Sequence, residues 1–214
     1  MLVDVPIKRE REGADPPADV MRVDLSWDAP CKSNRALAIA GVFGSEYMEV
    51  QFTKGNDRDF IEARRVDGTL EKTTFPKKGW FPHDAVHLIV ERRLRFQHGF
   101  WGRIARGATP DEIAAIAKAG GHASSARAVR PADEIIELLH AERLVECFEA
   151  EMWSKCSDNA TFRSILDAAC SQSKILSPQL LDEEIGDIRT ELKDTMDAWR
   201  ELAVGESLTL RMSW

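Results

Sequence analysis

The alternation of apolar and polar positions changes near residue 80, from a period of two to a period of about 3.6. Before that point, the alternation predicts half-buried strands, at residues 21–27, 48–52, 59–66 and 70–75. The last two are joined at Asp67-Gly68, a dipeptide that favours a tight hairpin turn. The first part of the chain is therefore expected to form a small sheet.

After residue 80, helical spacing predicts five helices, at residues 82–96, 110–119, 131–153, 158–170 and 177–204. Pro82 suits a first helical position, because the N–H group that it lacks is not needed there. Thr109 and Glu112 have the spacing of a capping box for the second helix. Gly120 and Gly121 then end that helix.

The last residues, 207–214, alternate again and predict a C-terminal strand that returns to the early sheet, since a single strand has no ladder partner. The predicted fold class is therefore α+β, with a small, mostly antiparallel sheet packed against about five helices. Residues 1–47 are interpreted as a partly flexible N-terminal extension, because their first part is charged and contains two consecutive prolines. Residues 48–214 are interpreted as a single α+β domain.

Composition narrows the class of protein. The 214 residues are 43% hydrophobic and 30% charged, which is ordinary for a globular chain. No apolar run approaches the roughly 20 residues of a membrane span, and the start lacks a signal-peptide core, so we expect a cytoplasmic location. The net charge of −7 argues against nucleic acid as a partner. Free thiols are expected for the four cysteines, Cys31, Cys147, Cys156 and Cys170.

The stretch FPHDAVHLIVE, residues 81–91, carries His83 and His87 four positions apart. Side chains with this spacing are neighbours on a helix, roughly 6 Å apart, so two imidazoles can share one metal ion. Glu91 lies about 12 Å along the axis from His83, which is too far for it to join both histidines on one ion. A third ligand is therefore expected from another part of the chain.

HDAVH resembles the H-E-x-x-H motif of the zincin metalloproteases, with Asp84 in the place of the general-base glutamate. Aspartate is one methylene shorter, so a water held for a glutamate would lie out of its reach. In a metal-dependent reading, Asp84 and Glu91 are the candidate catalytic carboxylates.

Three glutamates fall in the same sector of the 131–153 helix as its apolar residues: Glu142, Glu146 and Glu149. Carboxylates in an apolar stripe are costly unless they are paired, hydrogen-bonded or bound to a metal. The third ligand is expected among these three, and Glu146 is assigned to that position. The expected cofactor is a divalent metal ion, zinc before others.

An ordinary helix explains the same residues without a metal. Asp84 lies in the first turn, where a negative charge suits the helix dipole. Glu91 precedes Arg95 by four positions, the spacing of a surface ion pair. In this interpretation the two histidines hydrogen-bond nearby backbone, and the glutamates of the 131–153 helix pair with arginines.

Residues 91–107 interleave Phe96, Phe100 and Trp101 with five arginines, Arg92, Arg93, Arg95, Arg103 and Arg106. Arginine and tryptophan are enriched at protein interfaces, so a protein partner or a homo-oligomer is a candidate for the region around Phe100 and Trp101. The alternative is that the aromatic residues are buried in the core and the arginines form ion pairs with the excess carboxylates.

The same part of the chain has the order P-H-D-x-x-H-x-x-x-E followed by G-F-W-G. With the hairpin before it and the strand after a glycine at the end, it resembles a group of bacterial proteins of unknown function. The resemblance covers roughly residues 48–214. It implies a bacterial cytoplasmic origin, but no activity and no site residue, because none is established for that group.

Two functions follow from these patterns. The first is a soluble metal-binding protein that acts as a metal-dependent hydrolase through the His-Asp-x-x-His helix, in which the metal activates a water. The second is a non-enzymatic interaction or regulatory protein with structural histidines. Metal content separates the two.

Overall fold

A five-stranded sheet and six α-helices make up the described part of the chain, which in this computed structural model comprises residues 22–24, 47–77, 79–122, 130–154 and 158–213. The strand order in the sheet is β1-β5-β2-β3-β4. The strands are β1 (Arg22–Asp24), β2 (Met48–Thr53), β3 (Arg58–Arg64), β4 (Leu70–Pro76) and β5 (Ser207–Met212). The α+β class predicted from the sequence is confirmed.

The central strand β2 pairs antiparallel with both β3 and β5, so the C-terminal strand returns to the sheet as predicted. Residues at alternate positions of β2 are buried because they face the helices: Met48, Val50 and Phe52. β3 and β4 form the predicted hairpin, and Gly68 has a φ of 83° in its turn. β1 pairs in parallel with β5, which places these three residues of the predicted extension in the sheet.

The helices are α1 (His83–Arg93), α2 (Phe100–Ala105), α3 (Pro110–Ala117), α4 (Ile136–Ser154), α5 (Asn159–Gln172) and α6 (Asp182–Glu201). The capping box of Thr109 and Glu112 begins α3 as predicted. Pro82 is the N-cap of α1 and not its first residue, and α1 ends at Arg93, three residues earlier than predicted. The short helix α2 was not predicted, because six residues carry little periodicity.

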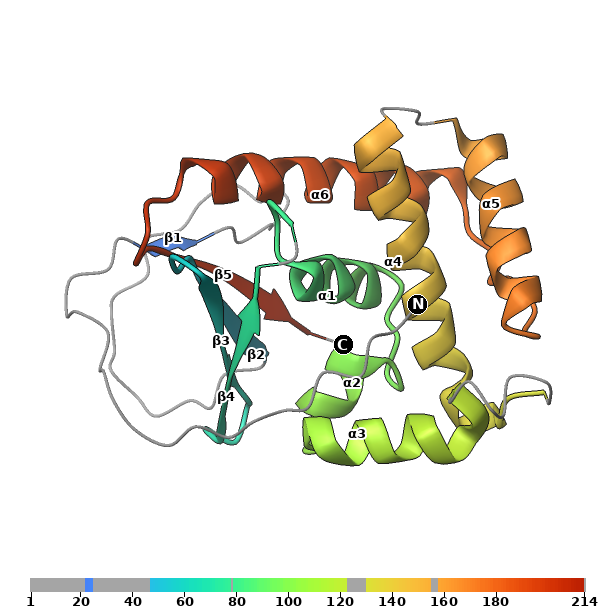
Figure 1. Cartoon of the computed structure of the whole chain (residues 1–214), viewed down its shortest axis with the longest axis horizontal. Helices are drawn as coiled ribbons and strands as arrows, with labels where there is room; N and C mark the ends of the chain where they lie inside the picture. Colours follow the sequence, from blue (N-terminus) through green and yellow to red (C-terminus); the bar gives the residue numbers. More distant parts are fainter. Residues whose placement is uncertain (1–21, 25–46, 78, 123–129, 155–157, 214) are drawn as a thin grey trace, which may run out of the picture.

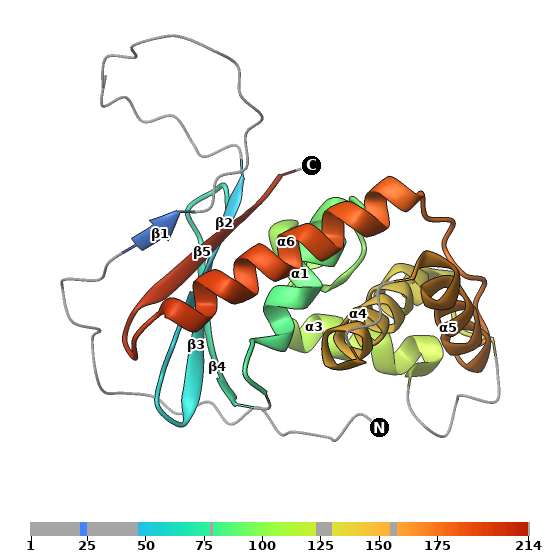
Figure 2. The same ribbon diagram turned by 90° about the horizontal axis from the view of Figure 1, so that it is seen from above.

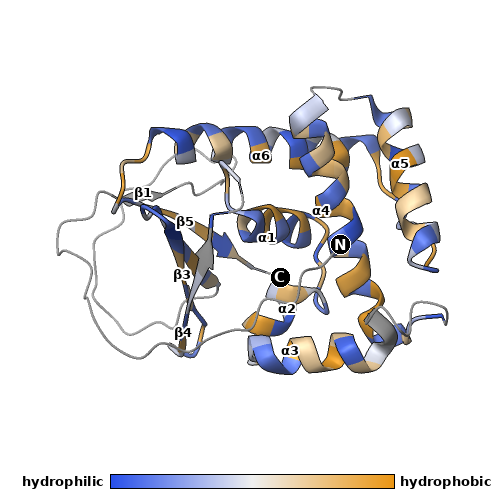
Figure 3. Cartoon of the chain, in the orientation of Figure 1, coloured by the Kyte–Doolittle hydropathy of each residue, from blue (hydrophilic) through white to orange (hydrophobic). Residues whose placement is uncertain are grey.

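All helices lie on one side of the sheet (Figures 1 and 2). There α1 lies between the sheet and α4, and α6 runs alongside α1 with its C-terminal end close to the start of β5. α6 is predominantly hydrophilic in Figure 3. Its buried apolar residues lie on one face: Ile185, Ile188, Leu192 and Trp199. Such an amphipathic helix covers a core with one face and leaves the other in water.

Among the described residues, no helix has the length and apolar character needed to cross a membrane. Cys147 and Cys170 are buried free thiols, as expected from the sequence. Cys31 and Cys156 lie outside the described residues.

Candidate metal centre

The candidate site is built on α1, which is buried on every side over most of its length. Residues 85–91 are all buried, and most of them are aliphatic. Two polar side chains lie within this run, His87 at 6% exposure and Glu91 at 0%. Burying a polar group is costly unless it has a hydrogen-bond or charge partner. The cost of burying His87 and Glu91 therefore depends on their neighbours.

His87 lies between two carboxylates. Its Nε2 is 3.9 Å from Glu142 Oε1 on α4, and its Nδ1 is 3.6 Å from Glu91 Oε1, one turn further along α1. Nδ1 is buried and has no hydrogen-bond partner. Burial opposes a charge on this ring, but Glu91, Glu142 and Asp84 outweigh it and raise the pKa of His87 to about 9.

His83 lies one turn before His87, at the exposed start of α1. Its Nδ1 is hydrogen-bonded to Glu149 Oε1 of α4 at 2.8 Å, which leaves Nε2 free of that contact. The two imidazole rings have their centroids 4.8 Å apart and are inclined at 74°. Residues four apart therefore do face the same region of space, as their spacing predicted.

A group of ligand atoms converges between α1 and α4. One ring nitrogen of His83, one of His87 and a carboxylate oxygen of Glu142 all lie within 4.8 Å of one another. Ligand atoms around a tetrahedral zinc ion are about 3.4 Å apart, given bonds of about 2.0–2.2 Å. Small side-chain movements would therefore close this group around an ion.

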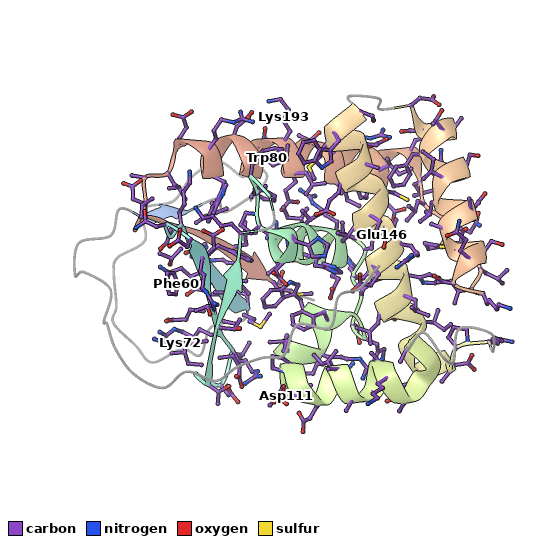
Figure 4. All side chains as sticks on the ribbon, viewed as in Figure 1. Phe60, Lys72, Trp80, Asp111, Glu146 and Lys193 are labelled. Atoms are coloured by element: carbon purple, nitrogen blue, oxygen red, sulfur yellow. The ribbon has the colours of Figure 1, made fainter. Side chains whose placement is uncertain are left out.

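Glu146, the ligand assigned from the sequence, is not part of this group. It is ion-paired with Arg143 on the same helix at 2.9 Å, and Figure 4 shows it on the stretch of α4 beside α1. Partial burial raises the pKa of its carboxyl, and the nearby charge of Arg143 opposes that rise. The α4 carboxylate that converges with the two histidines is therefore that of Glu142, one turn earlier than the predicted Glu146, because that turn faces His87.

Asp84 is half-buried at the edge of the group. Burial raises the pKa of its carboxyl, and His87 and His83 are close enough to act against that rise. Its backbone carbonyl accepts a hydrogen bond from Trp101 Nε1 at 2.9 Å. The Asp84 carboxyl is therefore close enough to interact with the charges of both histidines, but it is not part of the converging ligand group.

Glu91 occupies a different position from the one predicted. The surface ion pair with Arg95 is not formed: Glu91 is fully buried, whereas Arg95 is exposed at a φ of 53° beyond the end of α1. The carboxylate of Glu91 instead accepts hydrogen bonds from three backbone N–H groups at the start of α2. With both oxygens engaged inside the protein, it is not free to accept a proton from a water in the site.

The aromatic and arginine-rich region behaves mainly as the alternative interpretation expected. Trp101 is buried and its ring contacts Phe52 of β2 edge to face, while Phe100 is half-buried. Arg92 and Arg93 both form ion pairs with Glu191 of α6. A partner that binds this region would meet Phe100 and the arginines, since Trp101 is not at the surface.

Comparison of the chain with family models, with curated proteins and with solved structures gave no match.

Proposed function

We propose that the chain binds one divalent metal ion through His83, His87 and Glu142, and that the ion activates a water for hydrolysis. The observation that carries this proposal is the convergence of one ring nitrogen of His83, one of His87 and a carboxylate oxygen of Glu142 within 4.8 Å of one another, with the Nε2 atom of the buried His87 facing that carboxylate.

The donor set suits a catalytic ion more than a structural one. Two histidines and one carboxylate leave the fourth position of a tetrahedral zinc ion open for water, as in zinc hydrolases. Two histidines and one carboxylate also bind Fe²⁺ in oxygenases, where the ion keeps more than one coordination position open. Zinc would therefore indicate a hydrolase and iron an oxygenase. Zinc is the expected ion, because a zinc-bound water loses a proton near neutral pH and becomes a nucleophile.

Within this proposal, Asp84 would receive the proton of a water held closer to α1 than in a zincin, because its side chain is one methylene shorter than that of glutamate. It occupies the position after the first histidine, and burial raises the pKa of its carboxyl, which makes it a stronger base at neutral pH. We expect the activity in the cytoplasm, as the sequence predicts.

Elemental analysis of the untagged protein tests the proposal, with Glu142→Gln and Glu146→Gln as a matched pair. Both substitutions remove one negative charge from α4, but only Glu142 belongs to the ligand group. We expect about one zinc per chain in the wild type and in the Glu146→Gln variant. Loss of a ligand in Glu142→Gln should weaken binding by more than the about 10- to 100-fold typical of outer-sphere partners.

A wild-type protein that holds no zinc, iron or manganese after incubation with each ion would overturn the proposal. Equal metal content in the two glutamine variants would show that Glu142 is not a ligand. If the zinc-loaded wild type hydrolyses ester or peptide substrates in a screen and an Asp84→Asn variant retains its metal but not its rate, the role of Asp84 is supported.

A second candidate function, protein interaction, is favoured by large apolar side chains at the surface. Trp153 of α4 is 73% exposed and Leu176, after α5, is 89% exposed. Trp153 lies at the end of α4, and Leu176 lies near its start, where His140 is hydrogen-bonded to the Leu176 backbone. The two side chains therefore mark two separate parts of the surface that could each meet a partner. Light scattering over a range of concentrations, with a Trp153→Ser/Leu176→Ser variant as control, would reveal self-association through these residues.

A further inference from the structure

The two halves of the sequence order P-H-D-x-x-H-x-x-x-E and G-F-W-G meet in space. The glutamate of the first, Glu91, points at the backbone of the second, residues 99–102. Glu91 Oε1 accepts from the N–H of Phe100 at 3.1 Å, and Oε2 accepts from the N–H groups of Trp101 at 2.8 Å and Gly102 at 3.2 Å. These are the first N–H groups of α2, which lack partners within the helix.

The two glycines of G-F-W-G permit this close approach. A Cβ atom added at Gly99 would overlap the carboxylate of Glu91, and one added at Gly102 would overlap the backbone of Phe96 and Gln97. The absence of a side chain at Gly99 makes room for the carboxylate, and its absence at Gly102 makes room for the loop before α2. The motif thus places a fully buried carboxylate with very little freedom to move.

The fixed carboxylate lies next to a ring nitrogen. Glu91 Oε1 makes one hydrogen bond to backbone and lies 3.6 Å from His87 Nδ1, just beyond hydrogen-bond distance, and Nδ1 has no hydrogen-bond partner elsewhere. A carboxylate that accepts from Nδ1–H leaves Nε2 without a proton and able to bind a metal, the arrangement known from carboxylate–histidine–zinc sites. His83 has the same arrangement through Glu149, also on its Nδ1.

We infer that Glu91 is a positioning residue: it keeps the proton of His87 on Nδ1 and directs Nε2 toward Glu142 and the metal. This inference rests on the proposed metal site. It also links α2 to that site, because the amide groups of α2 fix the carboxylate that orients the ligand. The competing explanation is that Glu91 only caps α2 and has no effect on the metal.

Glu91→Gln separates the two explanations. A glutamine has one acceptor oxygen and an NH₂ group, so it cannot accept from the α2 amides and from His87 Nδ1–H in the same way. Glu112→Gln is the matched control: Glu112 also accepts a backbone N–H group at a helix start, in the capping box of α3, and is not in the ligand group. Both variants weaken a cap, but only one faces a histidine.

Three readouts are compared in the wild type and both variants: zinc affinity by competition with a chelator, the visible spectrum of the cobalt-substituted protein, and the tautomer of His87 by ¹⁵N NMR. We expect Glu91→Gln to weaken zinc binding about 10- to 100-fold and to change the cobalt spectrum. We expect Glu112→Gln to leave both unchanged. In the wild type, NMR should show the proton of His87 on Nδ1 and zinc on Nε2.

The outcomes are distinguishable. A wild type that binds no zinc or cobalt overturns the proposed function and this inference together. A wild type that binds both ions, beside a Glu91→Gln variant with the same affinity and spectrum, overturns this inference alone. If the variant does not fold, the wild-type NMR experiment decides, because zinc on Nδ1 of His87 would overturn the inference directly.

Discussion

The two ends of the seam between α1 and α4 contain the same residue types and behave differently. At the exposed end, His83 and Glu149 form a hydrogen bond of 2.8 Å, with 44% and 32% of their side chains exposed. At the buried end, His87 lies 3.9 Å from Glu142 and 3.6 Å from Glu91, and neither contact is a hydrogen bond. The exposed pair is joined by a hydrogen bond, whereas the buried histidine has carboxylates nearby without a hydrogen bond to either.

Burial is what separates the two ends energetically. An exposed histidine–glutamate pair gains little, because water screens its charges and replaces either partner. A buried histidine among carboxylates has no water to replace a lost partner, so each change there is costly. If one metal ion binds at both ends, the contact with His87 should therefore contribute more to its binding free energy than the contact with His83.

The largest expected effect distinguishes the two histidines in the metal-free protein. His87→Ala removes the cationic partner of the buried carboxylate Glu91 and should lower the free energy of unfolding by on the order of 3 kcal/mol. His83→Ala removes an exposed pair and should cost less than about 1 kcal/mol. Urea denaturation in the presence of a chelator measures both.

The salt dependence of the same denaturation experiment serves as the control. High salt screens exposed charges much more than buried ones, so the small effect of His83→Ala should vanish there and the effect of His87→Ala should persist. Equal losses for the two variants would contradict the contrast between the exposed and buried ends.

The next effect is the pH dependence of metal binding. The pKa of His87 is raised to about 9, above the ordinary value of 6.5, so below about pH 9 a metal must displace a proton from this ring. Zinc affinity should therefore fall by about tenfold per pH unit between about pH 8 and 7, where a histidine of ordinary pKa would already be neutral. Titration calorimetry in buffers of different ionisation enthalpy counts the protons released.

A proton count near zero at about pH 7.5 would show that His87 is already neutral in the metal-free protein. The Glu142→Gln variant sharpens this test, because Glu142 is one of the carboxylates that raise the pKa of His87. In that variant, the remaining zinc binding should become less dependent on pH above neutrality.

Most of the sheet could be predicted from the sequence because its strands are buried on one face only. Apolar side chains then alternate with polar ones, as in β2 and β5, and the pattern can be recognised without tertiary information. The short helix α2 could not be predicted, since its stability comes from the burial of Trp101 and from the carboxylate at its start. Both depend on residues outside the helix.

The histidine spacing predicted that His83 and His87 share one region, but not that their burial differs. On a helical wheel both fall at the edge of an apolar stripe, which suggests equal exposure. The structure surrounds α1 by the sheet, α4 and α6, so the edge of the stripe at His87 is covered and only the start of the helix reaches solvent. A wheel contains no information about how many neighbours a helix has.

The choice among the glutamates of α4 could not be made from the sequence for a related reason. Glu142, Glu146 and Glu149 share one sector of the helix, and only the position at which α4 passes α1 decides which of them faces each histidine. Glu142 faces His87, Glu149 faces His83, and Glu146 turns to Arg143. This pairing runs in opposite directions along the two helices, which is a property of their packing and not of either sequence alone.

The smallest expected effect concerns Glu149, the exposed counterpart of Glu91. Glu149→Gln keeps an acceptor oxygen for His83 Nδ1, and water can reach the pair because both side chains are partly exposed. The zinc affinity should fall only a few-fold, below the lower limit of about tenfold typical of outer-sphere partners. Competition with a chelator, with Glu91→Gln measured beside it, gives the ratio of the two losses. A larger loss for Glu149→Gln than for Glu91→Gln would mean that the exposed end, and not the buried one, orients the metal.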